Sequence, residues 1–364
     1  MKICIIGKYP PIQGGVSTLT AKLAFGLAVL GHDVYVVTNA REVEPPIKIY
    51  TEELFPKLKV PDRLKIYYTN PEGKYHISFS TPFVSKLAGL AKKVVKKNNC
   101  DLILSIYLEP YGVAAQLVSL WTNVPFMVSH AGSDVGHLIN NPDLYESYVE
   151  IFNNCHGILT SPKMISFFKN LKIPSEKLLL KQGHFSIDVQ DYIDTKEMRD
   201  FDLNHYIDQA SKLDEPYIKK YLHPFLKKQV AANSFVLGLY GKTSEFKAHI
   251  NLLHAIARLD SKVKSQVSIV FLTQGLEKDL IILIRTIQEL DLTKQVFMLP
   301  YIPYYMISAF IKCCHCVCYL ENNFPIEIHA PRIPREVLKE GGCLVISEEI
   351  ARKQSDFQDM VHFE

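Results

Sequence analysis

Short apolar runs alternate with helical patterns through most of the chain. In the first half, five runs have the continuous apolar character of strands that are buried on both faces of a parallel sheet. These runs are residues 3–6, 34–38, 102–107, 125–129 and 157–160. Between the first two, apolar residues recur at the spacing of one helix face: Val16, Leu19, Leu23, Leu27 and Leu30. This alternation predicts an α/β fold with a doubly wound parallel sheet.

The pattern changes after residue 194 and restarts at residue 234. Residues 195–233 are polar and charged with a helical pattern, and we interpret them as a bridge. After the bridge, strand patterns cover residues 235–240, 267–272, 295–299, 316–320 and 343–347. Helical patterns lie near residues 248–259, 277–290, 304–312 and 334–340. The sequence therefore predicts two Rossmann-like domains, residues 1–194 and 234–364, joined by the helical bridge.

Two lysines, Lys242 and Lys247, lie between a predicted strand and a predicted helix. They belong to the segment Gly-Lys-Thr-Ser-Glu-Phe-Lys-Ala at residues 241–248. Such a loop lies at the carboxyl edge of a sheet, where open α/β folds bind ligands. The amino end of the next helix adds partial positive charge. This combination predicts a site for a dianion, best a diphosphate, with two solvated surface lysines as the alternative.

Three further loops at predicted strand ends carry polar chemistry. Gly14 and Gly15, after the first strand, would let backbone N–H groups approach an anion or a sugar closely. His130 suits hydrogen bonding to sugar hydroxyls or moving a proton. Glu336, at the start of a predicted helix, could hold the paired hydroxyls of a ribose or hexose. Taken singly, each also has a structural explanation: a plain turn, a histidine bonded to nearby backbone, or a carboxylate on a helix dipole.

The bulk composition is that of an ordinary globular protein. Of 364 residues, 48% are apolar and 22% are charged, and the formal net charge is +3. The sequence has no basic tract for nucleic acid and no uninterrupted apolar run of the ~18 residues that suggest a membrane span. The first apolar run is too short for a signal peptide. We therefore expect a cytoplasmic protein that does not bind nucleic acid.

One cysteine cluster invites a zinc interpretation. Residues 313–318 read Cys-Cys-His-Cys-Val-Cys. Because the run continues as a strand, alternate side chains point to opposite faces and cannot converge on one metal. An Asp-x-Asp string at Asp200 and Asp202 lies in the polar bridge and not at a strand end. We therefore expect reduced, buried cysteines, no metal site and no cofactor.

The four loops, in this order, resemble the family-4 retaining glycosyltransferases, the group 1 glycosyltransferases of GT-B fold. The resemblance runs essentially end to end. Residues 1–40 are similar to the opening unit of the family, and residues 130–132 resemble its His-Gly segment. Residues 241–248 match its basic loop for the donor diphosphate, with Ala248 where glycine is usual. Glu336 resembles the second glutamate of its double-glutamate signature.

The resemblance implies two Rossmann-like domains facing each other across a cleft. It also implies a hexosyltransferase that uses a nucleotide-sugar donor such as a UDP- or GDP-hexose, with retention and without metal. Lys242 and Lys247 would stabilise the negative charge that grows on the leaving diphosphate, assisted by the amides of Gly14 and Gly15. The acceptor would be a glycan, a lipid-linked molecule or a small molecule.

The remaining roles come with two departures from the family pattern. His130 would contact the donor sugar, and Glu327 and Glu336 would hold hydroxyls of the sugar or ribose. Glu327 lies one residue too far from Glu336 for the usual spacing, and Glu321 lies much farther away. We prefer Glu327 as the first glutamate and keep Glu321 as the alternative. The family's second domain normally continues past the strand at 343–347, so we expect a domain that is shortened at its carboxyl end.

A basic helical pattern adds a possible partner, and two other functions stay open. Residues 85–99 carry lysines from Lys86 to Lys97 on one face, which could rest on anionic lipid at the inner face of a membrane. A solvated outer helix face is the alternative. The chain could also be a non-catalytic relative that binds nucleotide sugars. An NAD-dependent oxidoreductase is the third candidate, although the three-glycine fingerprint is missing after the first strand.

Overall fold

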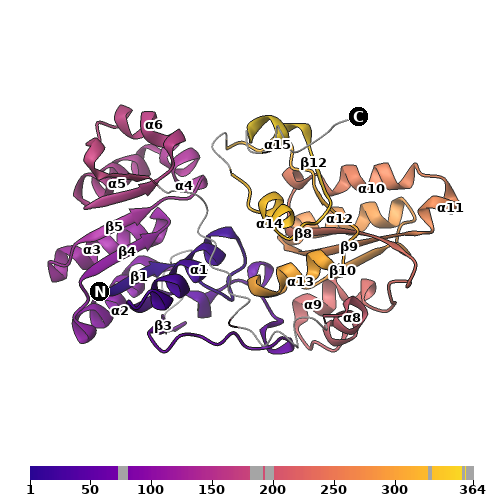
Figure 1. Cartoon of the computed structure of the whole chain (residues 1–364), viewed down its shortest axis with the longest axis horizontal. Coiled ribbons are helices and arrows are strands. Elements are labelled where there is room, and N and C mark those ends of the chain that lie inside the picture. Colours follow the sequence, from indigo (N-terminus) through magenta and orange to yellow (C-terminus); the bar gives the residue numbers. More distant parts are fainter. Residues whose placement is uncertain (73–80, 181–191, 193–200, 327–329, 355–356, 358–364) are drawn as a thin grey trace. The chain divides into compact units, whose positions relative to one another are not determined.

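The computed structural model describes residues 1–72, 81–180, 192, 201–326, 330–354 and 357. The chain divides into two compact units (Figure 1). Unit 1 contains residues 1–43 and 59–189, and unit 2 contains residues 44–58 and 190–364. Each unit is an α/β structure around a parallel sheet, as the sequence predicts.

Unit 1 is built on a seven-stranded sheet with the order β3-β2-β1-β4-β5-β6-β7. The strands are β1 (Lys2–Gly7), β2 (Asp33–Thr38), β3 (Leu64–Tyr68), β4 (Leu102–Ile106), β5 (Phe126–Ser129), β6 (Gly157–Thr160) and β7 (Leu178–Leu180). Neighbouring strands pair in parallel, with Ile5 opposite Val36 on one side and Leu104 on the other. The strand order reverses between β1 and β4, which makes this the switch point of the sheet.

The helices of unit 1 connect these strands. They are α1 (Gly15–Val29), α2 (Phe83–Asn98), α3 (Val113–Thr122), α4 (Ser133–Gly136), α5 (Pro142–Asn154) and α6 (Ile165–Asn170). Helices α2 and α3 both end at an asparagine in the left-handed conformation, Asn99 and Asn123. Asparagine tolerates this conformation better than most residues, so each helix stops where the chain turns into the next strand.

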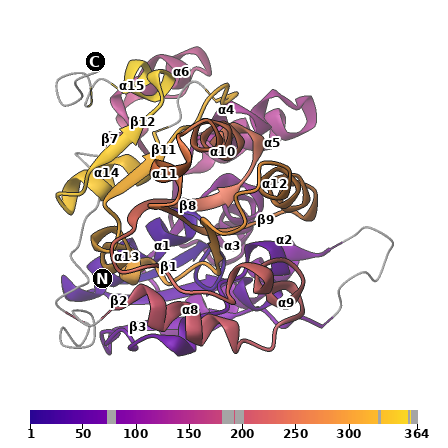
Figure 2. The ribbon, with the colours of Figure 1, turned by 90° about the vertical axis from the view of Figure 1, so that its right-hand side faces the viewer.

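Unit 2 is built on a five-stranded sheet with the order β10-β9-β8-β11-β12. The strands are β8 (Phe235–Thr243), β9 (Val267–Gly275), β10 (Val296–Leu299), β11 (Cys316–Tyr319) and β12 (Leu344–Ile346). The helices are α8 (Leu203–Ser211), α9 (Pro216–Tyr221), α10 (His249–Ala257), α11 (Ser261–Lys264), α12 (Glu277–Glu289), α13 (Ile307–Lys312), α14 (Ile333–Lys339) and α15 (Glu348–Lys353). Helices α10 and α12 lie side by side (Figures 1 and 2).

A segment from the first half of the chain packs in unit 2. The sequence pattern placed residues 44–58 inside the first domain, whereas the structure groups them with the second. The Thr51 hydroxyl donates to the carbonyl of Tyr301 at 2.8 Å. The buried amide of Gln274 donates to the carbonyl of Lys48 at 2.7 Å and accepts from the N–H of Tyr301 at 3.1 Å. These bonds between side chains and backbone fix the segment beside the ends of β9 and β10.

All ten predicted strands are confirmed, with ends shifted by at most three residues. The structure adds the edge strands β3 and β7, which the sequence pattern missed. The bridge contains α8 and α9, and their apolar faces join the core of unit 2. Among the described residues, no helix combines the length and apolar character that crossing a membrane requires.

Candidate functional site

The strand order of unit 2 reverses between β8 and β11, and this switch point brings polar side chains together. In open α/β sheets, ligands bind outside the carboxyl ends of the strands at such a point. The lysine segment follows β8, and Tyr319 and Glu321 come from the end of β11. The carboxyl edge of these two strands is therefore the candidate donor site of unit 2.

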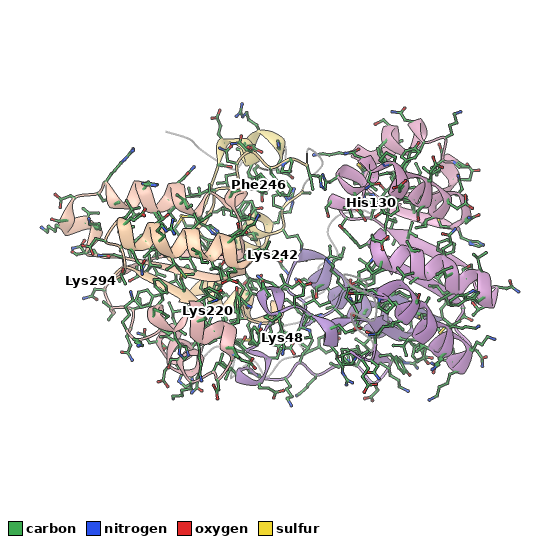
Figure 3. The ribbon with its side chains drawn as sticks, turned by 180° about the vertical axis from the view of Figure 1, so that it is seen from behind. Lys48, His130, Lys220, Lys242, Phe246 and Lys294 are labelled. Atoms are coloured by element: carbon green, nitrogen blue, oxygen red, sulfur yellow. The ribbon has the colours of Figure 1, made fainter. Side chains whose placement is uncertain are left out.

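Lys242 lies on the strand itself, which corrects the sequence interpretation. Strand β8 continues to Thr243, and Lys242 pairs with Gln274 of β9. The Thr273 hydroxyl donates to the carbonyl of Gly241 at 2.9 Å, which ties the end of β8 to β9. Gly241 has φ 125°, a conformation that side chains with a Cβ rarely adopt. The exposed Lys242 side chain thus projects from a firmly paired strand end (Figure 3).

Lys247 is held within unit 2 and is not a solvated loop lysine. It ends the short turn η10 (Glu245–Lys247), and its Nζ donates to the Tyr319 hydroxyl at 2.7 Å and to the carboxylate of Glu321. The ammonium also lies 4.5 Å from the centre of the Tyr319 ring. Burial lowers the pKa of Lys247 from its usual value, and the Glu321 carboxylate opposes that shift. Lys247 is therefore oriented by β11, with Glu321 balancing its charge.

The start of α10 explains the residue that follows Lys247. Ala248 is the N-cap of the helix and has φ 50° and ψ 29°, the left-handed conformation. Glycine adopts this conformation at lower cost than alanine. His249 then packs its ring at 5.3 Å from the ring of Phe271 on β9. Burial lowers the pKa of His249 to about 3, and Lys247 adds to the shift, so the ring is neutral near pH 7.

Glu336 lies in the first turn of α14, beside the end of β8. The Tyr240 hydroxyl donates to its carboxylate at 3.2 Å, and the guanidinium of Arg332 lies 3.7 Å away. Burial raises the pKa of Tyr240 well above its usual value, so the hydroxyl stays protonated and can donate. Glu327 lies outside the described residues. Glu321, the alternative first glutamate, is fully buried against Lys247.

The carboxyl edge of unit 1 carries the two predicted glycines. Gly14 has φ 127° and is the N-cap of α1, and Gly15 is its first residue. A Cβ on Gly14 would meet no atom within 4 Å, so the backbone conformation alone requires glycine here. Gly14 has no side chain that could cap the first N–H groups of α1. Their position at the β1–β4 switch point suits an anion or a sugar.

Two polar side chains at this edge, the buried Gln13 and the half-buried Lys8, were missed by the sequence analysis. The amide of Gln13 is 3% exposed, and neither its oxygen nor its nitrogen has a partner in the part of the chain that is described. The Nζ of Lys8 lies 5.3 Å from the centre of the Tyr107 ring, and burial lowers its pKa. Both residues follow β1, and unsatisfied buried amides are rare in native proteins. In the sequence, only their position after a predicted strand could have indicated that these two residues belong to a site.

His130 lies at the end of β5, largely buried (Figure 3). Its Nε2 is 2.7 Å from the Thr160 hydroxyl at the end of β6, and its ring lies 5.6 Å from that of Phe168. Asp134, in the same loop, is buried and accepts from the backbone N–H groups of Ala131 and Val135 at 2.9 and 3.0 Å. The histidine is therefore oriented by protein groups, and the aspartate holds the loop together.

No group of three or more histidine, cysteine or acidic side chains that could hold a metal occurs among the described residues. Cys316 and Cys318 lie two residues apart on β11, hence on one face. All eight cysteines are free thiols. Of the Asp-x-Asp string, only Asp202 is described, and its carboxylate caps α8 through the N–H of His205 at 2.6 Å.

Comparisons with known proteins agree with this architecture. Residues 12–160 match the family described as "Glycosyl transferase 4-like". HepE of Anabaena, solved with UDP and glucose, is similar at 18% identity and a TM-score of 0.58, covering 96% of this chain and 81% of that one. The chain has the GT-B glycosyltransferase fold. Its resemblance to the group 1 glycosyltransferases is confirmed.

Further GT-B structures show the same likeness. WaaG, a glycosyltransferase involved in lipopolysaccharide biosynthesis, has 13% identity and a TM-score of 0.59, with 98% of this chain and 84% of that one covered. Sucrose-phosphate synthase from Thermosynechococcus elongatus has 12% identity and a TM-score of 0.59, with 95% and 81% covered. Among curated proteins, no sequence matches the chain. At these identities, the structures establish the fold.

Proposed function

We propose that the chain is a metal-independent hexosyltransferase that retains configuration and takes its sugar from a nucleoside-diphosphate hexose. The observation that carries the proposal is the placement of Lys242 and Lys247 at the β8–β11 switch point of unit 2. HepE, which shares the fold, is solved with UDP and glucose. A uridine or guanosine diphosphate is therefore the donor group that we test first.

Two ammonium groups in different environments suit a diphosphate both as part of the incoming donor and as the leaving group. Lys242 is exposed and can meet the incoming anion, whereas Lys247 is already oriented by Tyr319 and Glu321. Preorganised charge stabilises a transition state without reorganisation when negative charge grows on the leaving diphosphate. Glu336 lies at the same edge, and its carboxylate is available to accept from ribose or sugar hydroxyls.

In unit 1, the proposed contacts are the N–H groups at Gly14 and Gly15 and the imidazole of His130. The unsatisfied amide of Gln13 beside the glycines supports a polar ligand at this edge, because burial without a partner is costly. We assign the acceptor, whether a glycan, a lipid-linked molecule or a small molecule, to this unit.

Calorimetric titration with UDP and with GDP, in the presence of a chelator, tests the donor site. Losing one charge-assisted contact weakens binding about 10- to 100-fold, and we expect this for Lys242→Ala. Lys294→Ala is the matched control, because this exposed lysine precedes β10 at the amino edge of the same sheet (Figure 3). Equal affinities of the two variants would contradict the proposal, as would the absence of binding by either nucleotide to the folded wild type.

Turnover and stereochemistry need separate measurements. Hydrolysis of UDP-glucose or GDP-mannose by the wild type, followed by NMR of the anomeric proton, reports transfer to water and the configuration of the first product. Retention predicts that the α-linked donors release α-glucose or α-mannose first. Nucleotide binding without hydrolysis or transfer to any acceptor would favour the non-catalytic relative instead.

A further inference from the structure

The carboxyl ends of α2 and α3 form an exposed patch that the proposed function does not use. On α3, the side chains of Leu120 and Trp121 are 67% and 45% exposed. The Nζ of Lys92 on α2 lies 5.1 Å from the centre of the Trp121 ring, so the two helices meet here. The α2–α3 patch consists of Lys92, Lys93, Lys96, Lys97, Leu120 and Trp121.

The charged side chains of α2 and α3 are all positive. Helices α2 and α3 contain five lysines and no carboxylate. The apolar stripe of α2, including Leu87, Ala91 and Val95, is buried, which leaves the lysines of the patch on the outer face. A nearby acidic residue, Asp101, accepts a hydrogen bond from the backbone N–H of Lys2 at 2.7 Å.

Lys86 does not belong to the α2–α3 patch, so the basic face is shorter than the Lys86 to Lys97 stretch that the sequence suggested. Its ammonium is paired with the buried carboxylate of Glu42, near the opposite end of α2. The basic face is therefore concentrated in the last two turns of the helix, next to Trp121.

We propose that the α2–α3 patch docks on the surface of an anionic phospholipid bilayer. Tryptophan is suited to the headgroup level of a membrane because its ring is apolar and its N–H can still meet water. Leu120 adds apolar surface for the acyl boundary, and the lysines attract anionic headgroups. A soluble polyanion would use the charges but would leave the two apolar side chains in water, so the combination favours a bilayer.

The patch lies at the opposite end of unit 1 from the candidate site. Helix α2 ends at Asn98 just before β4 begins, and α3 ends at Thr122 just before β5 begins. The patch is therefore near the amino ends of the strands, whereas Gly14 and His130 follow carboxyl ends. A bilayer on the patch leaves the site edge of unit 1 open, so docking does not depend on the proposed function.

The experiment uses the fact that Trp121 is the single tryptophan of the chain. The full-length protein is mixed with vesicles of phosphatidylcholine alone or of phosphatidylcholine with phosphatidylglycerol, and Trp121 emission and cosedimentation are followed. With anionic vesicles we expect a blue shift, quenching by brominated lipid, cosedimentation and reversal by salt. With neutral vesicles we expect much weaker binding.

Variants test the charges and keep the fold. Each lysine near an anionic surface is worth about fivefold in partitioning, so the triple variant Lys93→Gln/Lys96→Gln/Lys97→Gln should bind about 100-fold more weakly. The matched control is Lys262→Gln/Lys278→Gln/Lys294→Gln, which removes the same charge from exposed positions of unit 2. It should bind like the wild type, and both variants should show wild-type urea unfolding.

Several results would overturn the proposal. The wild type could fail to bind anionic vesicles, or it could bind them with no change in Trp121 emission, which would place the contact on another face. Equal weakening in the two triple variants would show attraction by net charge alone. The same blue shift with heparin as with vesicles would identify a soluble polyanion as the partner.

Discussion

Acid should destabilise unit 2 through His249. This histidine is buried at the start of α10, and burial lowers its pKa to about 3. The unfolded chain binds a proton near the ordinary histidine pKa of about 6.5. Between these two values the unfolded state holds more protons than the folded state, so stability falls as pH falls. From about pH 7.5 to about pH 5, this one group should cost about 2 kcal/mol.

The assay is urea unfolding followed by circular dichroism at both pH values, with hydrogen exchange of the α10 amides to localise the effect. His249→Phe removes the titrating ring and keeps an aromatic side chain against Phe271, so the wild type should lose about 2 kcal/mol more than this variant. Ile256→Val, in the same helix, removes a buried methylene and no titratable group. It should shift stability equally at both pH values. Parallel losses in the wild type and His249→Phe would refute the reasoning.

Three further predictions concern the β8–β11 switch point. Gly241→Ala should cost about 1–3 kcal/mol in urea unfolding because φ 125° strains any residue with a Cβ, although the added atom has room at 3.4 Å from Ile333; an unchanged midpoint would contradict this. Lys247→Met should lower the free energy of unfolding by about 3 kcal/mol, because it leaves the buried Glu321 carboxylate uncompensated. In a double-mutant cycle, Lys247→Met/Glu321→Gln should recover part of this loss. An equal loss in the single and the double variant would argue against a stabilising Lys247–Glu321 pair. Glu321→Gln should weaken UDP binding in calorimetry because buried Lys247 loses the carboxylate that keeps it charged and positioned; equal or tighter binding would contradict this role of the carboxylate.

The central strands could be predicted because parallel strands buried on both faces leave continuous apolar runs. The edge strands could not. In β3, only Leu64 is buried, and β7 has two exposed leucines among three residues, so neither gives a long apolar run. The last residues of β8 are polar, and the sequence pattern ended the strand at Tyr240. The structure extends it because the Thr243 and Thr273 hydroxyls, 2.6 Å apart, and the ladder with β9 satisfy the polar groups.

Residues 44–58 show a different limit. They have no strand or helix periodicity, and chain order alone assigned them to the first domain. They are held in unit 2 by hydrogen bonds from the Thr51 hydroxyl to the Tyr301 carbonyl and from the buried Gln274 amide to the Lys48 carbonyl, with partners far along the chain. Such contacts leave no local pattern, because the partners are ordinary polar groups whose proximity is decided by the tertiary fold.

The same reasoning explains what the sequence could say about the lysines. Their position between a strand and a helix predicted a basic carboxyl edge, and both lie beside the β8 end. Their environments could not be predicted, because Glu321 is 74 residues from Lys247 and reaches it only when β11 pairs with β8. The charges of Lys247 and Glu321 nearly cancel at a distance, because the two groups are paired. A buried lysine without this carboxylate would pay a large desolvation cost or lose its proton. The acidic partner therefore keeps Lys247 charged and positioned, at the cost of a weaker long-range attraction for an anion.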